Sequence, residues 1–338
     1  MNVLKFLFFA LLLSPVCLPA QSAEMRFGEV PVEDWKVEDC PWDTIPGALI
    51  LGDQGHIRVY IESGKGYMQA FKRHVRIKIL DEKAYDFANI TIPYYSKEGK
   101  ESVRDIKAHT LLPGNIKRPV NPKDIFTEKI NDNWSARKFT FPALQPGAIL
   151  EYEYLLESEY VFSLDKWEFQ HELPVRWSRL NVDFEANLSY AYIVEFPAVK
   201  QLSNNNRGQI TYANGASSSF QGNTFIMRRL PGLREEAYMT TLNDYRSRIR
   251  FQLSEIIRSD GSKQPYLSTW EKVASDLLND EVFGKRYLKK SNTKKLLETG
   301  LPQMAAAASQ KEKVDAACRF IKSKVQDRGR RGDRKSVV

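Results

Sequence analysis

Six glutamates between positions 151 and 172 are the residues of this chain that most invite a catalytic interpretation. They are Glu151, Glu153, Glu157, Glu159, Glu168 and Glu172. Two carboxyl groups on either side of a glycosidic bond can act as general acid and base. Glutamates that alternate with apolar residues are more typical of the solvent face of a strand. Because sequence sets no distance between carboxyl groups, we assign none of them a catalytic role.

Cysteine chemistry is not indicated either. Cys318 falls on the apolar face of a predicted helix, away from a helix N-terminus that would lower the pKa of its thiol. No histidine follows it in the chain, so we expect a small buried hydrophobic residue there. The other cysteine that export would leave, Cys40, lies far away in sequence. The spacing does not indicate a disulfide, although an oxidising compartment would permit one.

The four histidines lack the spacing of a metal site. His56 and His74 fall on the polar faces of their predicted strands, and His109 and His171 stand alone. No pair is spaced i, i+4 or in alternation, although a site built from distant strands stays open. The chain also has no glycine-rich phosphate loop. We therefore expect no metal, no bound cofactor and no catalytic residue.

Basic residues give the chain a formal charge of +8. Arg246, Arg248 and Arg250 share one strand face, where they could bind an anion or pair with the glutamate-bearing strand; pairing is the commoner outcome. Further basic clusters lie at 285–295 and 328–335. Neither contains interleaved aromatic residues, so we interpret them as a solvated helix face and an unnatural tail, and expect no nucleic-acid partner.

The elements that must position these residues are mostly strands. Between Ile57 and Leu253, apolar and polar residues alternate repeatedly and Pro-Gly steps punctuate the pattern. This predicts a mainly β chain whose residues 53–260 form a large antiparallel β-sandwich. Residues 24–52 form a lead-in with Trp35 and Trp42. Such tryptophans can form a carbohydrate platform, but more often they pack on a domain edge.

The stretch 138–157 dominates this pattern. It reads as a hairpin of two strands joined at Pro146 and Gly147, which suit a turn. After the turn, one face of the second strand carries apolar and aromatic side chains: Leu150, Tyr152, Tyr154 and Leu156. Such a face needs a second layer to cover it.

The periodicity changes near residue 265. Two capping-box patterns, Ser268–Glu271 and Ser309–Glu312, each precede an apolar helical stripe. We therefore predict a helical segment over 265–326, with a further short helix between 292 and 304. The last stripe contains Val314, Ala317, Cys318, Ile321 and Val325.

Neither end of the chain is predicted to be part of the folded domain. Residues 1–23 have the basic start, short apolar run and small residues of a secretory signal peptide. No later stretch is apolar enough for a stable membrane anchor. Residues 327–338 are interpreted as an artefactual tail, because 333–338 resemble the translation of a common sequencing adapter. We expect the natural frame of this chain to end near residues 326–332, where the gene itself would continue with other residues in place of the tail.

The motif Phe139-x-Phe-Pro-x-Leu-x-Pro-Gly-x-Ile-Leu-Glu-Tyr-x-Tyr resembles the hallmark of the domain of unknown function 3857. Further matching pieces are the strand and turn at 103–114 and the helices at 270–274 and 313–322. The resemblance implies an exported bacterial module ahead of a transglutaminase-like core, with residues 265–326 leading into that core. The catalytic Cys, His and Asp of such a core would come later, so Cys318 does not take their role.

We therefore expect a non-catalytic β-sandwich module of an exported, periplasmic or secreted protein, truncated before its core. Its expected partners are a peptide or cell-envelope polymer and, in the full-length protein, the transglutaminase-like core. The alternative is a stand-alone envelope protein that binds peptides or glycans.

Overall fold

The structure, a computed structural model, describes residues 24–43, 47–114, 116–195, 206–211, 217–285, 302 and 309–324. The chain divides into two compact units, Met1–Leu267 and Ser268–Val338. The predicted signal peptide, the tail and nearly all of the predicted helix at 292–304 lie outside the described residues.

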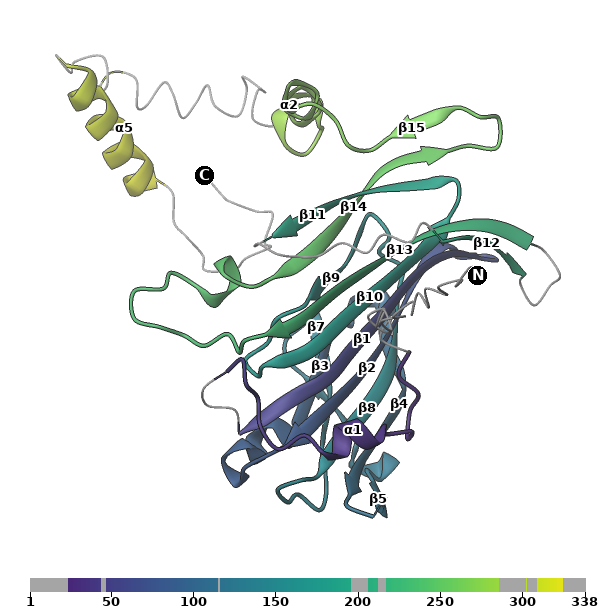
Figure 1. Ribbon diagram of the computed structural model, residues 1–338. Helices are drawn as coiled ribbons and strands as arrows, with labels where there is room; N and C mark the ends of the chain where they lie inside the picture. The colour runs from purple at the N-terminus through teal and green to yellow at the C-terminus, as the bar shows by residue number, and fades with distance from the viewer. Residues whose placement is uncertain are drawn as a thin grey trace, which may run out of the picture. The chain divides into compact units, whose positions relative to one another are not determined.

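Strands dominate the first unit, as predicted (Figure 1). Its largest sheet has the order β12-β13-β10-β1-β2-β8-β4-β5 within the described residues. The bounds of its strands are β12 (Asn206–Thr211), β13 (Ser217–Leu230), β10 (Val175–Glu185), β1 (Ala48–Glu62), β2 (Gly66–Ile79), β8 (Ile149–Ser158), β4 (Glu101–Leu112) and β5 (Ile116–Pro119). One central pair departs from the predicted antiparallel sheet, because β1 and β10 run parallel. Strand β1 also starts five residues before the predicted boundary at 53.

Two smaller sheets complete the described strands. One has the order β3 (Asn89–Tyr95), β7 (Trp134–Thr140) and β6 (Phe126–Lys129). The other joins β11 (Leu188–Glu195), β14 (Arg248–Ile257) and β15 (Lys263–Pro265), with β9 (Ser163–Glu168) also paired to β14. Short 3-10 turns span Glu82–Ala88, Lys97–Gly99, Pro122–Asp124 and Leu242–Asp244.

A single apolar cluster joins all three sheets. Leu150, Tyr152, Tyr154 and Leu156 of β8 are buried in it, which confirms the predicted face of this strand. Residues from both smaller sheets, such as Phe139 and Phe251, belong to the same cluster. The smaller sheets therefore pack on one face of the large sheet, where apolar side chains of alternate residues meet.

The predicted hairpin over 138–157 is wrong. Strand β7 belongs to the small sheet and β8 to the large one, so the chain crosses between layers at the Pro-Gly turn. The Gly147 amide donates to Ile79 O at 2.8 Å, which ties the turn to β2. Crossing layers lets Phe139 face Tyr152 across the core, with ring centroids 6.1 Å apart. A hairpin would place both aromatic rings in one sheet.

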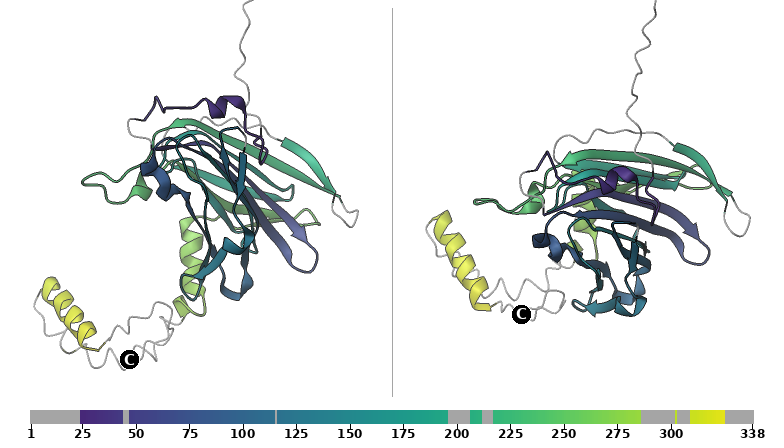
Figure 2. Two further views of the ribbon diagram at one scale, coloured as in Figure 1. Left: turned by 90° about the horizontal axis from the view of Figure 1, so that it is seen from below. Right: turned by 60° about the horizontal axis from the view of Figure 1, so that its bottom comes forward.

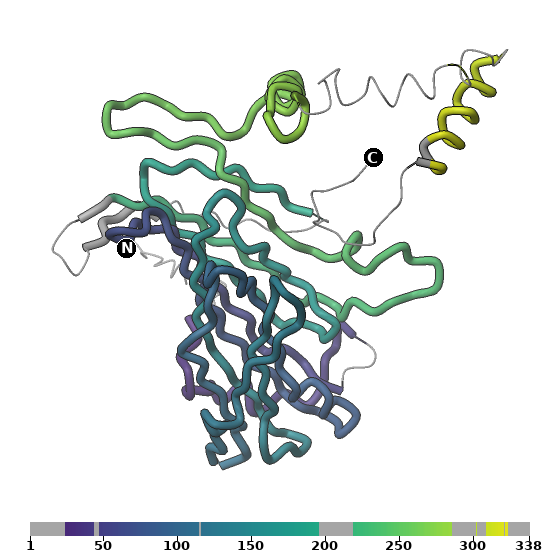
Figure 3. Tube along the Cα trace, turned by 180° about the vertical axis from the view of Figure 1, so that it is seen from behind, coloured from purple at the N-terminus to yellow at the C-terminus, as the bar shows by residue number. Residues whose placement is uncertain are grey.

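The opposite face of the large sheet carries the lead-in with its short helix α1 (Val32–Trp35). Two views show this segment on the far side of the large sheet from β3 and β7 (Figures 2 and 3). Trp35 and Trp42 pack there against a second buried cluster that includes Leu49, Leu51 and Ile149. Trp42 also donates to Leu230 O at 3.2 Å. Both tryptophans therefore pack on the domain rather than forming an open platform.

The second unit contains α2 (Trp270–Asn279) and α5 (Gln310–Lys324). The Ser309–Glu312 capping box is confirmed by bonds in both directions. The other predicted box is shifted by one residue, because Thr269 accepts the Lys272 amide. In α5 the prediction of a buried Cys318 is wrong. The buried residues are Ala316 and Phe320, which are spaced i, i+4 beside the predicted stripe, and Cys318 is free and exposed.

Among the described residues, none of the helices has both the length and the apolar character needed to cross a lipid bilayer.

Candidate functional site

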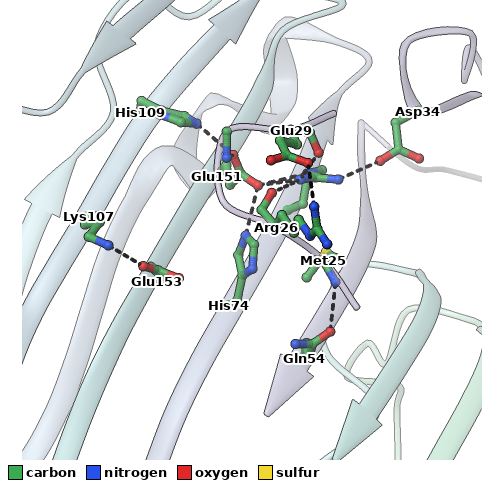
Figure 4. A network of polar contacts seen from close by, with 12 residues as sticks. Met25, Arg26, Glu29, Asp34, Gln54, His74, Lys107, His109, Glu151 and Glu153 are labelled. Atoms are coloured by element: carbon green, nitrogen blue, oxygen red, sulfur yellow. Dashed lines mark hydrogen bonds and ion pairs between the residues drawn. The ribbon is translucent and has the colours of Figure 1, made fainter. Parts of the chain in front are cut away.

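Two clusters of charged and histidine side chains occupy opposite faces of the large sheet. The first, the Glu151 cluster, consists of Asp34, His74, Arg76, His109 and Glu151. Figure 4 labels all of these except Arg76. Both imidazoles bond the Glu151 carboxylate through Nε2, His74 at 2.9 Å and His109 at 2.7 Å. Arg76 bonds the same carboxylate at 2.5 Å and Asp34 at 3.1 Å. Because a carboxylate can only accept, each imidazole donates its Nε2 proton.

The lead-in closes the Glu151 cluster from outside. The Gly28 amide donates to Glu151 Oε2 at 2.8 Å, and Arg76 donates to the carbonyl of Glu29 at 2.9 Å. The Phe27 ring lies 4.4 Å from His109, centroid to centroid. Burial by itself would raise the pKa of Glu151, but the two histidines and Arg76 outweigh it and hold that pKa well below its usual range. A fully satisfied buried network of this kind fixes the lead-in to the sheet.

The second cluster, the Arg73 cluster, consists of Asp53, Arg73 and His171 on the core face. Arg73 binds Asp53 through two bonds of 2.9 and 2.8 Å, and His171 Nε2 lies 2.7 Å from the same carboxylate. The guanidinium carbon of Arg73 also lies 5.3 Å from the ring centroid of Trp167. Burial acts to raise the pKa of Asp53, yet Arg73 and His171 outweigh it and lower that pKa to about 2.

The Arg73 cluster opens onto a groove between the two smaller sheets, which we call the β3–β9 groove. It consists of two hollows of about 220 and 350 Å³. Arg73, Thr91 and Tyr152 line both hollows, so the two adjoin at these residues. Strand β3 forms one wall, residues of β9 and the segment 171–173 form the other, and β2 and β8 form the floor. An aromatic and apolar hollow with a few directed polar groups is the usual form of a binding site.

Asp165 supplies an unusual carboxyl group in this groove. Its Oδ2 accepts from Gln69 Nε2 at 2.7 Å. Burial raises the pKa of Asp165 to about 6, and the charge of Glu101 adds to the effect. Unlike Asp53, which Arg73 binds, this carboxyl group accepts from a neutral amide, which offsets its burial only in part.

The imidazoles of both clusters are bound to carboxylates rather than to nucleophiles. In each cluster, the carboxylate that accepts a hydrogen bond from an imidazole also accepts one from an arginine. Among the described residues, no serine, threonine or cysteine side chain bonds either set of imidazoles, so neither has the arrangement of a nucleophile and its base. Within the same part of the chain, no group of three His, Cys, Asp or Glu side chains could hold a metal ion.

The six glutamates weighed from sequence do not converge. Glu151 and Glu153 are buried, so the predicted solvent face is wrong for both: the lead-in covers Glu151, and two lysines hold Glu153. Glu157 pairs with Arg104, and Glu159 with Lys100. Glu168 pairs with Arg246, and exposed Glu172 lines the groove.

The remaining candidates are placed as follows. Arg248 and Arg250 both pair with Glu195 of β11, so cross-strand pairing of the basic strand is confirmed. The predicted partner is wrong, because β14 lies beside β11 and not beside the glutamate-bearing strand β8. His56 pairs with Asp183 at 2.6 Å. Cys40 is free and buried. Of the two basic clusters, 328–335 and nearly all of 285–295 lie outside the described residues.

Sequence reasoning missed Asp53 and Arg73. A signal existed, since Arg73 stands at an apolar position of β2, between Phe71 and Val75 in the alternation. A charged residue on the core face of a strand must have a buried partner.

Comparison with known proteins bears on the first unit. Residues 67–214 match the family described as "Domain of Unknown Function with solved-structure structure (DUF3857)". This match supports the predicted resemblance over those residues, which include the crossover from β7 to β8. No curated protein matches the chain.

Among solved structures, the chain is similar to one described as a "putative protease" from Parabacteroides distasonis, determined at 2.00 Å resolution. The TM-score is 0.53 and the sequence identity 11%. The match covers 83% of this chain and 51% of that one, so the chain spans about half the length of the structure it resembles. At this identity the likeness concerns the fold alone.

Proposed function

We propose, from the DUF3857 match over residues 67–214, that this chain supplies a non-catalytic β module of an exported protein. In this proposal the module holds a peptide or cell-envelope polymer for a transglutaminase-like core carried on a longer chain. The length of the similar structure, about twice the part matched here, supports a further region. The predicted signal peptide at 1–23 supports export to the periplasm or beyond.

The observation that carries the proposal is the β3–β9 groove. Its floor carries Tyr152, Tyr154 and Arg73, and its walls come from two different sheets. Trp167 of β9 lies in one wall, with its ring 5.3 Å from the guanidinium carbon of Arg73. Such a surface can bind a polymer without acting on it. The histidine–carboxylate pairs on both faces are already held by arginine, which suits support and binding better than proton transfer.

The alternative is a stand-alone envelope protein that binds peptides or glycans. In this alternative the β3–β9 groove would still be the binding site. The two proposals differ in whether the module is joined to a catalytic core.

The test begins with the parent gene, read past the codon for Val325, which precedes the predicted artefactual tail. The present chain and any longer product should then be compared for binding to envelope material and for turnover of peptide substrates. We expect both to bind and only the longer product to show turnover. Turnover by the present chain, or no retention on envelope material, would contradict the proposal. A natural stop codon after Val338 would favour the stand-alone alternative.

A further inference from the structure

We propose that the β3–β9 groove binds an extended peptide with basic side chains, which adds as a strand to the free edge of β3. This inference rests on the proposed binding function and names its ligand class. It depends on which backbone groups of β3 are available, which wall can accept a strand, and what charge lines the groove.

The pairing of β3 with β7 shows which backbone groups face outward. The carbonyl of Ala88 accepts from Phe141 and the amide of Ser96 donates to Asn133, so even-numbered residues bond towards β7. In an antiparallel pair, the residues between them direct their amides and carbonyls to the other edge. Pro93 has this outward position, where its missing amide proton costs β3 no bond to β7.

Thr91 is the centre of the outward edge. The outward amide of Asn89 bonds Asp86 O, and that of Tyr95 bonds Glu101. Within the part of the chain that the structure describes, the amide and carbonyl of Thr91 and the carbonyl of Pro93 remain for a new strand to bond. Thr91 lines both hollows of the groove, so this part of the edge faces the space that a peptide would occupy. Strand addition of this kind gives affinity through main-chain bonds and selectivity through pockets for alternate side chains.

The opposite wall is a poorer edge. The pairing of β9 with β14 shifts between Ile249 and Phe251, which is the irregularity of a β-bulge. The amide of Asp165 bonds the Gln69 side chain at 3.3 Å. A bulged edge with an occupied amide resists strand addition, so the peptide is assigned to β3.

Charge selects the kind of peptide. The cationic side chains that line the two hollows are Arg73 and Lys166, whereas the acidic ones are Asp86, Asp165, Glu168 and Glu172. Arg73 is already bound to Asp53, and Glu168 pairs with both Lys166 and Arg246. Asp86, Asp165 and Glu172 therefore leave the groove acidic in a chain of formal charge +8. Complementarity therefore favours lysine or arginine side chains and disfavours acidic ones.

The experiment uses the whole chain and two fluorescein-labelled six-residue peptides, one alternating valine with lysine and one alternating valine with glutamate. Binding is measured by fluorescence polarisation against two substitutions at one position. Thr91→Pro removes the outward amide, and Thr91→Val keeps it with nearly the same volume. We expect Thr91→Pro to weaken binding of the lysine peptide by about tenfold or more and Thr91→Val to change it by less than about twofold.

A second measurement tests strand addition without altering the protein, so it still applies if Thr91→Pro does not fold. N-methylation of alternate residues of the lysine peptide removes peptide donors without changing the protein. We expect one of the two methylation patterns to abolish binding and the other to spare it. Charge is tested with Glu172→Gln, which should weaken the lysine peptide and reduce its salt dependence.

The outcomes separate the two proposals. Failure of both peptides to bind would overturn this inference, and absence of retention on envelope material would separately overturn the binding function. Binding of the lysine peptide that ignores Thr91→Pro and both methylation patterns would overturn strand addition alone. Equal binding of the glutamate peptide would overturn the preference for basic side chains.

Discussion

The Glu151 cluster and the Arg73 cluster use the same chemical groups for different ends. Each has a fully buried carboxylate bound by an arginine and by histidine. Their arginines differ, since the side chain of Arg76 is 2% exposed and that of Arg73 is 24% exposed. The lead-in covers the first cluster with backbone donors and acceptors, whereas the second borders an open groove. What covers a charged cluster therefore decides whether it is sealed within the fold or borders an open groove.

The largest test of this comparison is Glu151→Gln. The substitution leaves Arg76 buried with one carboxylate partner fewer and replaces an acceptor for two imidazoles. We expect a loss of about 3–5 kcal/mol in the free energy of unfolding, measured by urea denaturation. The matched control on the same strand is Glu157→Gln, whose pair with Arg104 is partly exposed and contributes less than about 1 kcal/mol. Equal losses for the two variants would contradict a sealed supporting role.

Asp53→Asn should lower the free energy of unfolding by a smaller amount, about 2–3 kcal/mol. The loss is smaller because the Arg73 side chain can still be hydrated through the groove. The pKa of Asp53 lies near 2 in the folded chain, below its unfolded value. Its stabilisation is therefore complete above about pH 4 and is lost as pH falls towards 2. The difference between wild type and variant should shrink over that window in urea titrations. A constant difference would show that charge is not the cause.

The smallest expected effect, of opposite sign, belongs to Asp165→Asn. Because the pKa of Asp165 is raised to about 6, its ionisation disfavours the folded state. The penalty grows from about pH 4 and is complete above about pH 6. The variant should therefore be more stable than wild type by about 1–2 kcal/mol at pH 8 and no more stable at pH 4. Thermal unfolding at the two pH values measures this, and stabilisation at both would refute the assignment.

Sequence patterns predicted well what depends on local alternation. The core face of β8 followed from period two, because neighbouring residues of a strand must point to opposite faces. The same pattern could not show that Glu151 is buried, since the cover comes from Gly28, more than a hundred residues earlier. Local patterning cannot distinguish a polar face in water from one beneath another segment.

Turn chemistry had a similar limit. Pro146 and Gly147 correctly marked a turn, but a turn does not specify which strand the chain will pair with afterwards. The groove escaped prediction because it lies between edges of two sheets. Arg73 at an apolar position and Pro93 within a strand were the local signs of a buried partner and of an edge strand.

The parallel pairing of β1 with β10 also bears on how the chain reaches its fold. Strands β1 and β2 are neighbours in sequence and can pair early. The other edge of β1 stays unpaired until β10 is available to place Val175 opposite Ile50. More than a third of the polypeptide must be available before the centre of the large sheet can close. Contacts of such long range slow folding, and an early β1–β2 hairpin leaves an unpaired apolar edge exposed during the delay. The time between synthesis of β1 and arrival of β10 is therefore the period in which this chain is most open to aggregation or to capture by a chaperone.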